Sequence, residues 1–347
     1  MRKTTTRSTD FDTHDGLFIN VFDRKLKPFN YFIGGRGIGK TYSALWYFQH
    51  YEIPFLYMRN TIKQIDKCKT LMGNPFKRIN KDFGTDIRLD SELDHAIINK
   101  YIEGRDEPVF LGYAVALSDF EAIRGIDLSD VDYALFDEFI QRKGKLQYNQ
   151  FEAFTDFYET AARNREILGE EPCRVLLCTN SQKVGSEILA GFGLIPHLER
   201  LIYKGGGVWR DGTTHLEYFP KQKISELKGN TALYRALGSN NKLSREFLDN
   251  EFAHDSFTGI GAVPLREYTG YCVLDEFYFY KHKSQRQFYV CRVPFTLTDA
   301  GQKFSSIDNF PYFMRRYGIR LKDAYIEGRL KCSEYFIKIT LAELWKL

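Results

Sequence analysis

The glycine-rich stretch GGRGIGKT, at Gly34–Thr41, is the part of the chain whose residue types most directly suggest chemistry. Its spacing fits G-x-x-x-x-G-K-[ST], in which backbone N–H groups surround a phosphate, the lysine reaches the β- and γ-phosphates and the hydroxyl ligates Mg²⁺. The alternative is an ordinary strand-to-helix turn with a solvated lysine. We predict a nucleotide-binding loop that consists of Gly34, Gly35, Arg36, Gly37, Ile38, Gly39, Lys40 and Thr41.

Hydrolysis of a nucleotide also needs a carboxylate near the metal and a base for the attacking water. The apolar run VDYALFDEF at 131–139 ends in Asp137 and Glu138, which suits an Asp that supports Mg²⁺ and a Glu that activates water. An ordinary acidic pair at a strand end is the alternative. The run YCVLDEF at 271–277 offers the same local pattern, but we interpret it as part of one long strand in which Asp275 and Glu276 are surface or bend residues.

Two further sets of polar residues follow downstream. A predicted helix with Asn149 as its N-cap ends near Arg163 and Arg165, and an arginine there could act as a finger on a neighbouring subunit's γ-phosphate or simply favour the helix dipole. Thr179 and Asn180 come directly after the apolar run RVLLC, where ligands of open α/β sheets bind. They could sense the γ-phosphate or position water, or they could cap the next turn.

Alternating strands and helices must position these residues. Apolar runs predict strands at 29–33, 54–59, 95–102, 109–118, 131–139 and 174–178. Helical spacing of apolar residues predicts helices at 41–51 and 149–165, and a basic helical stretch runs through Lys81. The glycine-rich loop therefore joins a strand to a helix N-terminus, which is the context that the motif requires. The pattern indicates an α/β fold.

Composition supports a large globular chain. The 347 residues are 43% hydrophobic and 16% aromatic, and the formal net charge of +4 is too small to indicate a nucleic-acid protein by itself. The six cysteines form no CxxC pair, the N-terminus lacks a signal-peptide core, and no apolar run could span a bilayer. We therefore expect no membrane association and a reducing cytoplasm.

The chain becomes β-rich after a hairpin-like segment at 205–220. We predict a first domain at 1–225, a linker at 226–247 and a C-terminal domain at 248–347, in which 266–280 and 286–297 pair as neighbours. A nuclease of the ribonuclease-H type needs several carboxylates around two metals. Asp275, Glu276, Asp299 and Asp308 are available, but their spacing specifies no such cluster.

The order of these motifs resembles the phi29-type DNA-packaging motor ATPases of small tailed phages, which are related to large-terminase ATPase domains. The resemblance covers most of the chain, and it is strongest from Phe29 to Asn180. It is carried by GGRGIGKT, Met58–Arg59 at a strand end, LSDFEAIRG, ALFDEF, RNR and LLCTN. The resemblance implies an ASCE-type P-loop ATPase domain with a mainly parallel sheet. It also implies a small β-rich α+β domain with a degenerate, non-cleaving ribonuclease-H-like fold.

The resemblance also implies roles for individual residues. Lys40 and Thr41 would bind the phosphates of ATP and Mg²⁺, Asp137 would support the metal, and Glu138 would be the catalytic base. Arg163 matches the family's finger, which acts in trans. Arg124 in EAIRG matches a basic residue that acts in nucleotide exchange or hydrolysis between subunits, and Arg36 matches a loop arginine.

The partners implied are double-stranded DNA, a homo-oligomeric ring of five subunits, the phage portal and, in some members, a packaging RNA. The motor would work in the host cytoplasm, transiently at the portal vertex of the procapsid. A finger that acts in trans at every site also requires closed symmetry. Candidate contacts to the DNA backbone form two clusters: Arg142, Lys143 and Lys145, and Lys63, Lys67 and Lys69. Solvated surface loops are the alternative.

We therefore expect an ATPase that moves double-stranded DNA into a procapsid. Three alternatives stay open. A terminase-like ATPase would have an active nuclease, a P-loop kinase would transfer the γ-phosphate without stimulation by DNA, and a nucleotide-binding regulator would not hydrolyse at all.

Overall fold

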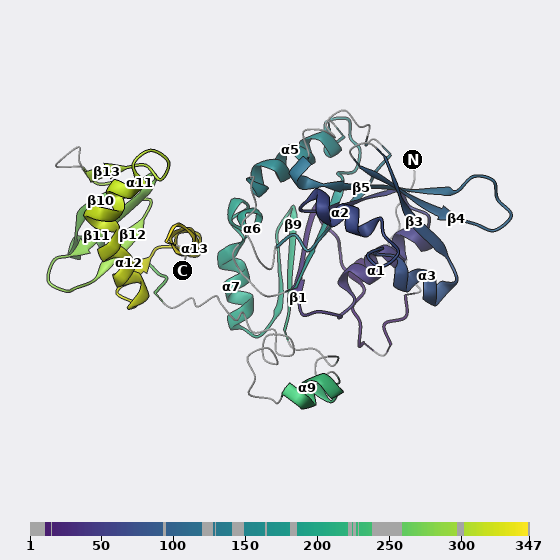
Figure 1. Cartoon of the computed structure of the whole chain (residues 1–347), viewed down its shortest axis with the longest axis horizontal. Coiled ribbons are helices and arrows are strands. Elements are labelled where there is room, and N and C mark those ends of the chain that lie inside the picture. The colour runs from purple at the N-terminus through teal and green to yellow at the C-terminus, as the bar shows by residue number, and fades with distance from the viewer. Residues whose placement is uncertain are drawn as a thin grey trace. The chain divides into compact units, whose positions relative to one another are not determined.

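The chain folds as two compact units, Met1–His254 and Asp255–Leu347, in a computed structural model (Figure 1). The structure describes residues 11–14, 16–92, 95–119, 128, 130–140, 149–163, 165–180, 186–220, 224, 227, 229–237, 259–296 and 302–345. The predicted linker, 226–247, falls within the first unit, and its residues 238–247 lie outside the described ones.

A large, mostly parallel sheet forms the centre of the first unit. Among the described residues it has nine strands in the order β3-β4-β5-β2-β6-β7-β1-β9-β8. The bounds are β1 Phe29–Gly34, β2 Phe55–Arg59, β3 Asp86–Ser91, β4 Ala96–Tyr101, β5 Val109–Ala116, β6 Tyr133–Asp137, β7 Arg174–Thr179, β8 Gly207–Arg210 and β9 Thr214–Phe219. The six consecutive strands β5-β2-β6-β7-β1-β9 run parallel to one another. At one edge β3 and β4 pair antiparallel, and at the other edge β8 pairs antiparallel with β9. The predicted α/β class with a mainly parallel sheet is confirmed.

Helices cover both faces of this sheet because alternate side chains of each strand point to opposite faces. Phe32, Tyr57 and Leu135 face a core shared with α1, α2 and α3. Phe29 and Phe136 instead contact Phe154 of α5 on the other face, with only the Phe136 ring stacked on it. The helices that the structure describes in this unit are η1 Val21–Asp23, α1 Lys40–His50, α2 Ile62–Cys68, α3 Lys77–Phe83, η2 Leu117–Asp119, α5 Gln150–Ala162, α6 Glu187–Gly191, α7 Ile195–Tyr203 and α9 Ala232–Leu237.

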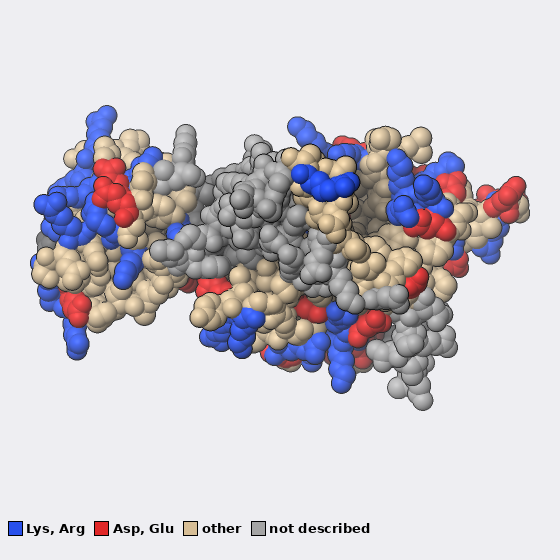
Figure 2. All heavy atoms as spheres, turned by 90° about the horizontal axis from the view of Figure 1, so that it is seen from below, with Lys and Arg blue, Asp and Glu red and all other residues tan. Residues whose placement is uncertain are grey.

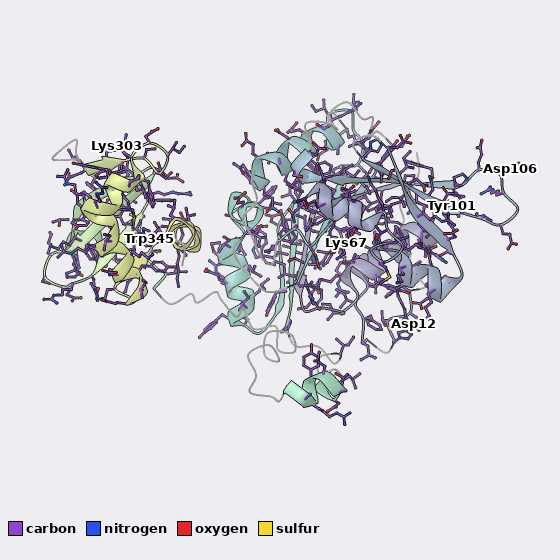
Figure 3. The ribbon with its side chains drawn as sticks, viewed as in Figure 1. Asp12, Lys67, Tyr101, Asp106, Lys303 and Trp345 are labelled. Carbon is purple, nitrogen blue, oxygen red and sulfur yellow. The ribbon has the colours of Figure 1, made fainter. Side chains whose placement is uncertain are left out.

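The hairpin between β4 and β5 projects beyond the rest of the sheet, and Tyr101 and Asp106 mark it in Figure 3. Its strands were predicted, but β3, which pairs with β4, was not. The segment DIRLDS alternates apolar and polar residues over only two cycles, so its local signal is weak.

Among its described residues, the second unit has a five-stranded sheet with helices, in the strand order β13-β10-β11-β12-β14. Its elements are η3 Leu265–Glu267, β10 Tyr268–Leu274, β11 Phe277–His282, β12 Phe288–Cys291, β13 Lys303–Phe304, α11 Phe310–Phe313, a π-helical turn at Met314–Gly318, α12 Ile319–Ile326, β14 Leu330–Cys332 and α13 Tyr335–Leu344. Its core joins Phe279 and Val290 of the sheet to Leu321 and Leu341 of the helices.

One prediction for this unit was wrong. The run around Asp275 and Glu276 is not one long strand but a tight hairpin, in which β10 and β11 pair antiparallel. Asp275 has a positive φ of 53° and forms the turn, where its carboxylate accepts a hydrogen bond from the Ser306 N–H at 3.0 Å. The predicted pairing with the next apolar run is confirmed, because β11 pairs with β12.

All six cysteines are buried and unpaired. In the part of the chain that the structure describes, no helix combines the length and the apolar character needed to cross a bilayer.

Candidate active site

The glycine-rich loop lies between β1 and α1, as predicted. Gly37 and Gly39 have φ angles of 78° and 96°, which glycine adopts without strain, and Gly39 directly precedes the first turn of α1. A Cβ at Gly39 would lie 3.1 Å from Phe18, so a larger residue there would press against the segment that covers the loop. The local sequence therefore builds a turn whose backbone N–H groups can approach an anion at a helix N-terminus.

Lys40 points into this loop. Its side chain is buried, with 5% of its surface exposed, and its Nζ donates to the carbonyl oxygens of Gly34 and Gly35 at 2.7 and 2.8 Å. A buried ammonium needs such acceptors, because desolvation without partners is costly. The lysine is thus held at the loop and is not a solvated surface group.

Thr41 and Asp137 meet across the carboxyl ends of the parallel strands. The Thr41 hydroxyl donates to Asp137 Oδ1 at 2.6 Å, and the hydroxyl of buried Tyr57 donates to Asp137 Oδ2 at 3.1 Å. Burial raises the pKa of Tyr57, and the nearby Asp137 charge raises it further. A threonine hydroxyl beside an aspartate carboxylate is the kind of oxygen-donor set that suits Mg²⁺. The two residues chosen from the sequence as metal-binding therefore lie together.

Arg59, at the end of β2, binds both acidic residues of the site. Its Nη1 lies 2.6 Å from Asp137 Oδ2 and its Nη2 lies 2.8 Å from Glu138 Oε2. Burial acts to lower the pKa of Arg59, but Tyr57, Asp137 and Glu138 outweigh it, so the pKa is raised. Within the described residues the Nε of Arg59 has no hydrogen-bond partner. The guanidinium therefore fixes two carboxylates that would otherwise repel each other.

Sequence reasoning did not choose Arg59 as a site residue. The signal would have been the pairing of β2 with β6, which places the ends of the two strands side by side. That pairing comes from sheet order and cannot be seen in either strand alone.

Glu138 sits directly after β6 with a φ of 53°, in the left-handed region that non-glycine residues seldom adopt. Such a conformation costs roughly 1 kcal/mol and persists only where the surroundings impose it. The side-chain amide of Asn60 donates to the Glu138 carbonyl oxygen at 2.8 Å. The Glu138 side chain remains 41% exposed, so it can reach solvent as a base must.

The remaining predicted site residues differ in how far they are buried. Thr179 is buried at the end of β7, the strand between β1 and β6, and its neighbour Cys178 is in register with Asp137. Asn180 follows Thr179 and is partly buried. Arg36 is exposed on the glycine-rich loop. Arg124 lies outside the described residues.

The two arginines of the tripeptide RNR differ in burial. Arg163 is exposed at the C-terminal end of α5 with a φ of 44°, and its N–H donates to the Glu159 carbonyl oxygen at 2.9 Å. Arg165 is buried and pairs with Asp132 at 3.0 Å. Arg163 is therefore the more accessible of the two arginines.

The two basic clusters also differ. Lys63 and Lys67 are exposed on α2, and Lys67 is labelled in Figure 3, whereas Lys69 pairs with Asp66 at 3.3 Å. Arg142, Lys143 and Lys145 lie outside the described residues.

The chain has recognisable relatives. The family model described as podovirus DNA encapsidation protein (Gp16) matches residues 18–263. The DNA packaging protein of Bacillus phage phi29 is 28% identical over 189 residues, which cover 52% of this chain and 49% of that protein. The DNA packaging protein of Bacillus phage B103 is 24% identical over 242 residues, which cover 68% of this chain and 66% of that protein.

Solved structures agree in fold. A chain of the bacteriophage Phi-29 viral genome packaging motor assembly superposes with a TM-score of 0.62 at 21% identity, and the match covers 95% of this chain and 99% of that one. A chain of the Phi-28 gp11 DNA packaging motor gives a TM-score of 0.58 at 18% identity, covering 94% and 96%.

The sequence match is narrower than the structural one, because the chain spans about half the length of the phi29 protein in that alignment. The family model nevertheless covers most of the chain and includes every residue of the site cluster. With the glycine-rich loop, the Asp137–Glu138 pair and the sheet order now placed, the chain belongs to the podovirus DNA encapsidation protein (Gp16) family.

Proposed function

We propose that the chain is an ATP-hydrolysing subunit of a phage DNA-packaging motor, which moves double-stranded DNA into a procapsid. The observation that carries the proposal is the cluster of Lys40, Thr41, Asp137 and Glu138 at the carboxyl edge of one sheet, in a chain of this family. The position of β7 between β1 and β6 supports an ASCE-type ATPase core, because the added strand brings Thr179 between the loop and the acidic pair.

Each residue of the cluster then has a chemical task. Lys40 and the loop N–H groups bind the phosphates, and Thr41 and Asp137 hold Mg²⁺, which neutralises charge on the phosphate oxygens when it is bound. Glu138 accepts a proton from the attacking water. Thr179 and Asn180 contact the γ-phosphate end or orient that water, and Arg36 contributes a positive charge at the loop.

A second subunit completes the site in this proposal. Arg163 would act as the finger in trans, since it is exposed at the end of α5, whereas Arg165 is buried. A finger at every site requires a closed ring, for which we propose five subunits. Arg124 would act between the same subunits.

We further propose that the chain consists of an ATPase domain at 1–225, a linker at 226–247 and a C-terminal domain at 248–347. The C-terminal domain would be a degenerate ribonuclease-H-like domain without nuclease activity. The position of Asp275 at a hairpin turn and the pairing of Glu276 with Arg292 at 3.4 Å give these carboxylates structural tasks. A metal-dependent nick in plasmid DNA that disappears in Asp275→Ala would overturn this part. The motor would act in the host cytoplasm at the portal vertex, with a packaging RNA as a further partner.

The first test is steady-state ATP hydrolysis with and without double-stranded DNA, over a wide range of protein concentration, for the unaltered chain and for Glu138→Gln. We expect hydrolysis that rises with DNA and with concentration, and a loss of at least about 100-fold in Glu138→Gln with nucleotide binding retained. Transfer of the γ-phosphate to a small acceptor, without stimulation by DNA, would identify a kinase instead. Binding without hydrolysis, even with portal added, would identify a regulator.

A further inference from the structure

A buried glutamine joins helix α5 to the acidic end of β6. Gln150 is the first residue of α5 and has only 3% of its surface exposed. Its Nε2 donates to Asn60 Oδ1 and to the Phe139 carbonyl oxygen, both at 2.6 Å, and its backbone N–H donates to Glu187 Oε2 at 2.6 Å. Both hydrogens of the side-chain amide are therefore used.

Asn60 continues this network to Glu138. It is completely buried at the end of β2, and its Nδ2 donates to the carbonyl oxygen of Glu138 at 2.8 Å. Its own carbonyl oxygen accepts from the Ser118 N–H at 3.1 Å, so Asn60 is fixed in turn. Gln150 thus holds the Phe139–Ile140 peptide directly, and it holds the Glu138–Phe139 peptide through Asn60. The Glu138–Phe139 peptide adjoins the Cα of Glu138, the residue whose φ is positive.

The other end of α5 carries Arg163. The helix has 13 residues, so it extends for about 20 Å between the two ends. Phe154 and Phe157 bury its middle, and Asn149 caps its start by accepting from the Glu152 N–H at 3.2 Å. A capped and packed helix moves as one body, so a displacement at Gln150 is carried to Arg163.

We propose that Gln150 is a positioning residue: it holds the backbone of Glu138 for catalysis and, through α5, ties the position of Arg163 to the state of the chain's own site. The inference rests on the proposed function, in which Glu138 acts within its own site and Arg163 acts on a neighbour. It adds a physical link between the two, because a shift of the Glu138 loop requires either a shift of α5 or the loss of the hydrogen bonds from Gln150 to Phe139 and from Asn60 to Glu138.

The variant Gln150→Met tests the positioning role, since methionine keeps the length and the volume but cannot donate. We expect kcat for ATP hydrolysis to fall at least about tenfold, while the Kd for a fluorescent ATP analogue with Mg²⁺ stays within about twofold. The matched control is Gln49→Met, because Gln49 is equally buried, at 3%, in α1 and far from Glu138 in sequence. Equal kcat values for the unaltered chain, Gln49→Met and Gln150→Met would overturn the proposal.

Hydrogen exchange measured by mass spectrometry tests the link along α5. In the unaltered chain, Mg²⁺ with a non-hydrolysable ATP analogue should change exchange at residues 159–167 as well as at 137–140, and in Gln150→Met only the change at 137–140 should remain. A nucleotide response confined to 137–140 in the unaltered chain would overturn the link, even if Gln150→Met failed to fold. Absence of ATP binding by the unaltered chain would be a failure of the proposed function instead.

Discussion

A single guanidinium holds the two carboxylates on which the proposed chemistry depends. Arg59 has 15% of its side chain exposed, and its contacts with Asp137 and Glu138 are 2.6 and 2.8 Å long. Two acidic groups on adjacent residues repel each other, and partial burial strengthens that repulsion. Arg59 is therefore as important for the shape of the site as the residues that would touch ATP.

Replacing Arg59 should make the repulsion between the Asp137 and Glu138 carboxylates measurable. We expect Arg59→Met to lower the free energy of unfolding by about 3 kcal/mol without added metal, because two part-buried carboxylates lose their common partner. Millimolar Mg²⁺ should restore part of this loss, since a divalent cation supplies the missing positive charge. Urea unfolding with EDTA or with Mg²⁺ measures both effects.

The control for this variant is Arg78→Met. Arg78 pairs with Asp82 on the exposed surface of α3 at 2.8 Å, and such surface pairs contribute little. Its stability should change little and should not respond differently to Mg²⁺. An Arg59→Met protein as stable as the unaltered chain in EDTA would show that the two carboxylates do not need the guanidinium.

The residues of the site differ in whether the neighbouring sequence is enough to identify them. Lys40, Thr41 and Asp137 were predicted because a loop motif and a strand end identify them within a few residues of sequence. Arg59 and Gln150 were missed because their roles arise from contacts with residues about 80 and 11 positions away, across strands and a helix whose neighbours are set by the sheet order.

At the scale of elements, an irregular strand closes the antiparallel part of the large sheet. The register of β4 and β5 shifts at Ile98 and Asn99, which pair with Gly112 and Phe110, so Leu111 is an extra residue in β5. Gly112 has a φ of 132°, and a Cβ on it would lie 1.8 Å from the Phe55 carbonyl oxygen. The bulge therefore depends on glycine at this one position.

The variant Gly112→Ala should separate β5 from β2. We expect a loss of at least about 3 kcal/mol in the free energy of unfolding, because backbone atoms of β2 must move. In the control Gly104→Ala, φ is also positive, at 79°, but no atom lies within 4 Å, so only the local cost of about 1 kcal/mol applies. Equal losses in the two variants, measured by urea unfolding, would contradict this account.

A chain of charged residues joins the N-terminal segment to the other edge of the sheet. Arg24 donates to both oxygens of Glu217 at 3.0 Å, and Glu217 also accepts from His215 at 3.0 Å. Arg210 donates to His215 Nδ1 at 2.7 Å, which leaves Nε2 as the donor to Glu217. Burial acts to raise the pKa of Glu217, but the hydrogen bonds from His215 and Arg24 outweigh it, so the pKa is lowered.

This network predicts a dependence of stability on pH. A carboxyl group whose pKa is lowered by folding stabilises the protein above its ordinary pKa of 4.5, and the stabilisation is lost as the pH falls through the folded value. We expect Glu217→Gln to cost about 2 kcal/mol at pH 7. The difference from the unaltered chain should shrink below pH 4.5. A constant difference from pH 7 to pH 3 in urea unfolding would contradict the assignment.

The elements that sequence reasoning placed correctly are those with long apolar runs or helical spacing, such as β1, α1 and α5. The hairpin of β10 and β11 was misread because only two residues, Asp275 and Glu276, separate its two apolar strands. Asp275 takes the positive φ that such a turn requires, but it is flanked by residues that favour strands on both sides. The propensity of this run to form a single strand was therefore outweighed by the antiparallel pairing of β10 with β11.

At the scale of the whole molecule, the charge is unevenly divided. The C-terminal unit, Asp255–Leu347, has 14 Lys and Arg against 10 Asp and Glu, a formal charge of +4 in its sequence. The first unit has 35 of each kind and no net charge. Figure 2 shows Lys and Arg gathered on the visible face of the C-terminal unit, at left. The attraction to a polyanion should therefore be concentrated in the smaller unit.

Binding of double-stranded DNA at several salt concentrations tests this division. The triple variant Arg315→Ala, Arg316→Ala and Arg320→Ala removes exposed charges from one helical segment of the C-terminal unit. We expect weaker binding and a shallower dependence of log K on log salt, by about one unit of slope for each phosphate that the variant no longer neutralises. The comparison variant replaces Lys63, Lys67 and Lys69 on the first unit and should have the smaller effect. A larger loss of affinity in the lysine variant would place the DNA-binding surface on α2.

The order of strands in the large sheet bears on how the protein is made. The strand that leads into the glycine-rich loop, β1, lies between β7 and β9, which follow it in the chain by more than 140 residues. During synthesis its apolar side chains leave the ribosome long before either partner exists. An unpaired apolar strand associates readily with other chains. We therefore expect the chain to be prone to aggregation until Phe219 has been added, and fragments that stop before β7 to aggregate.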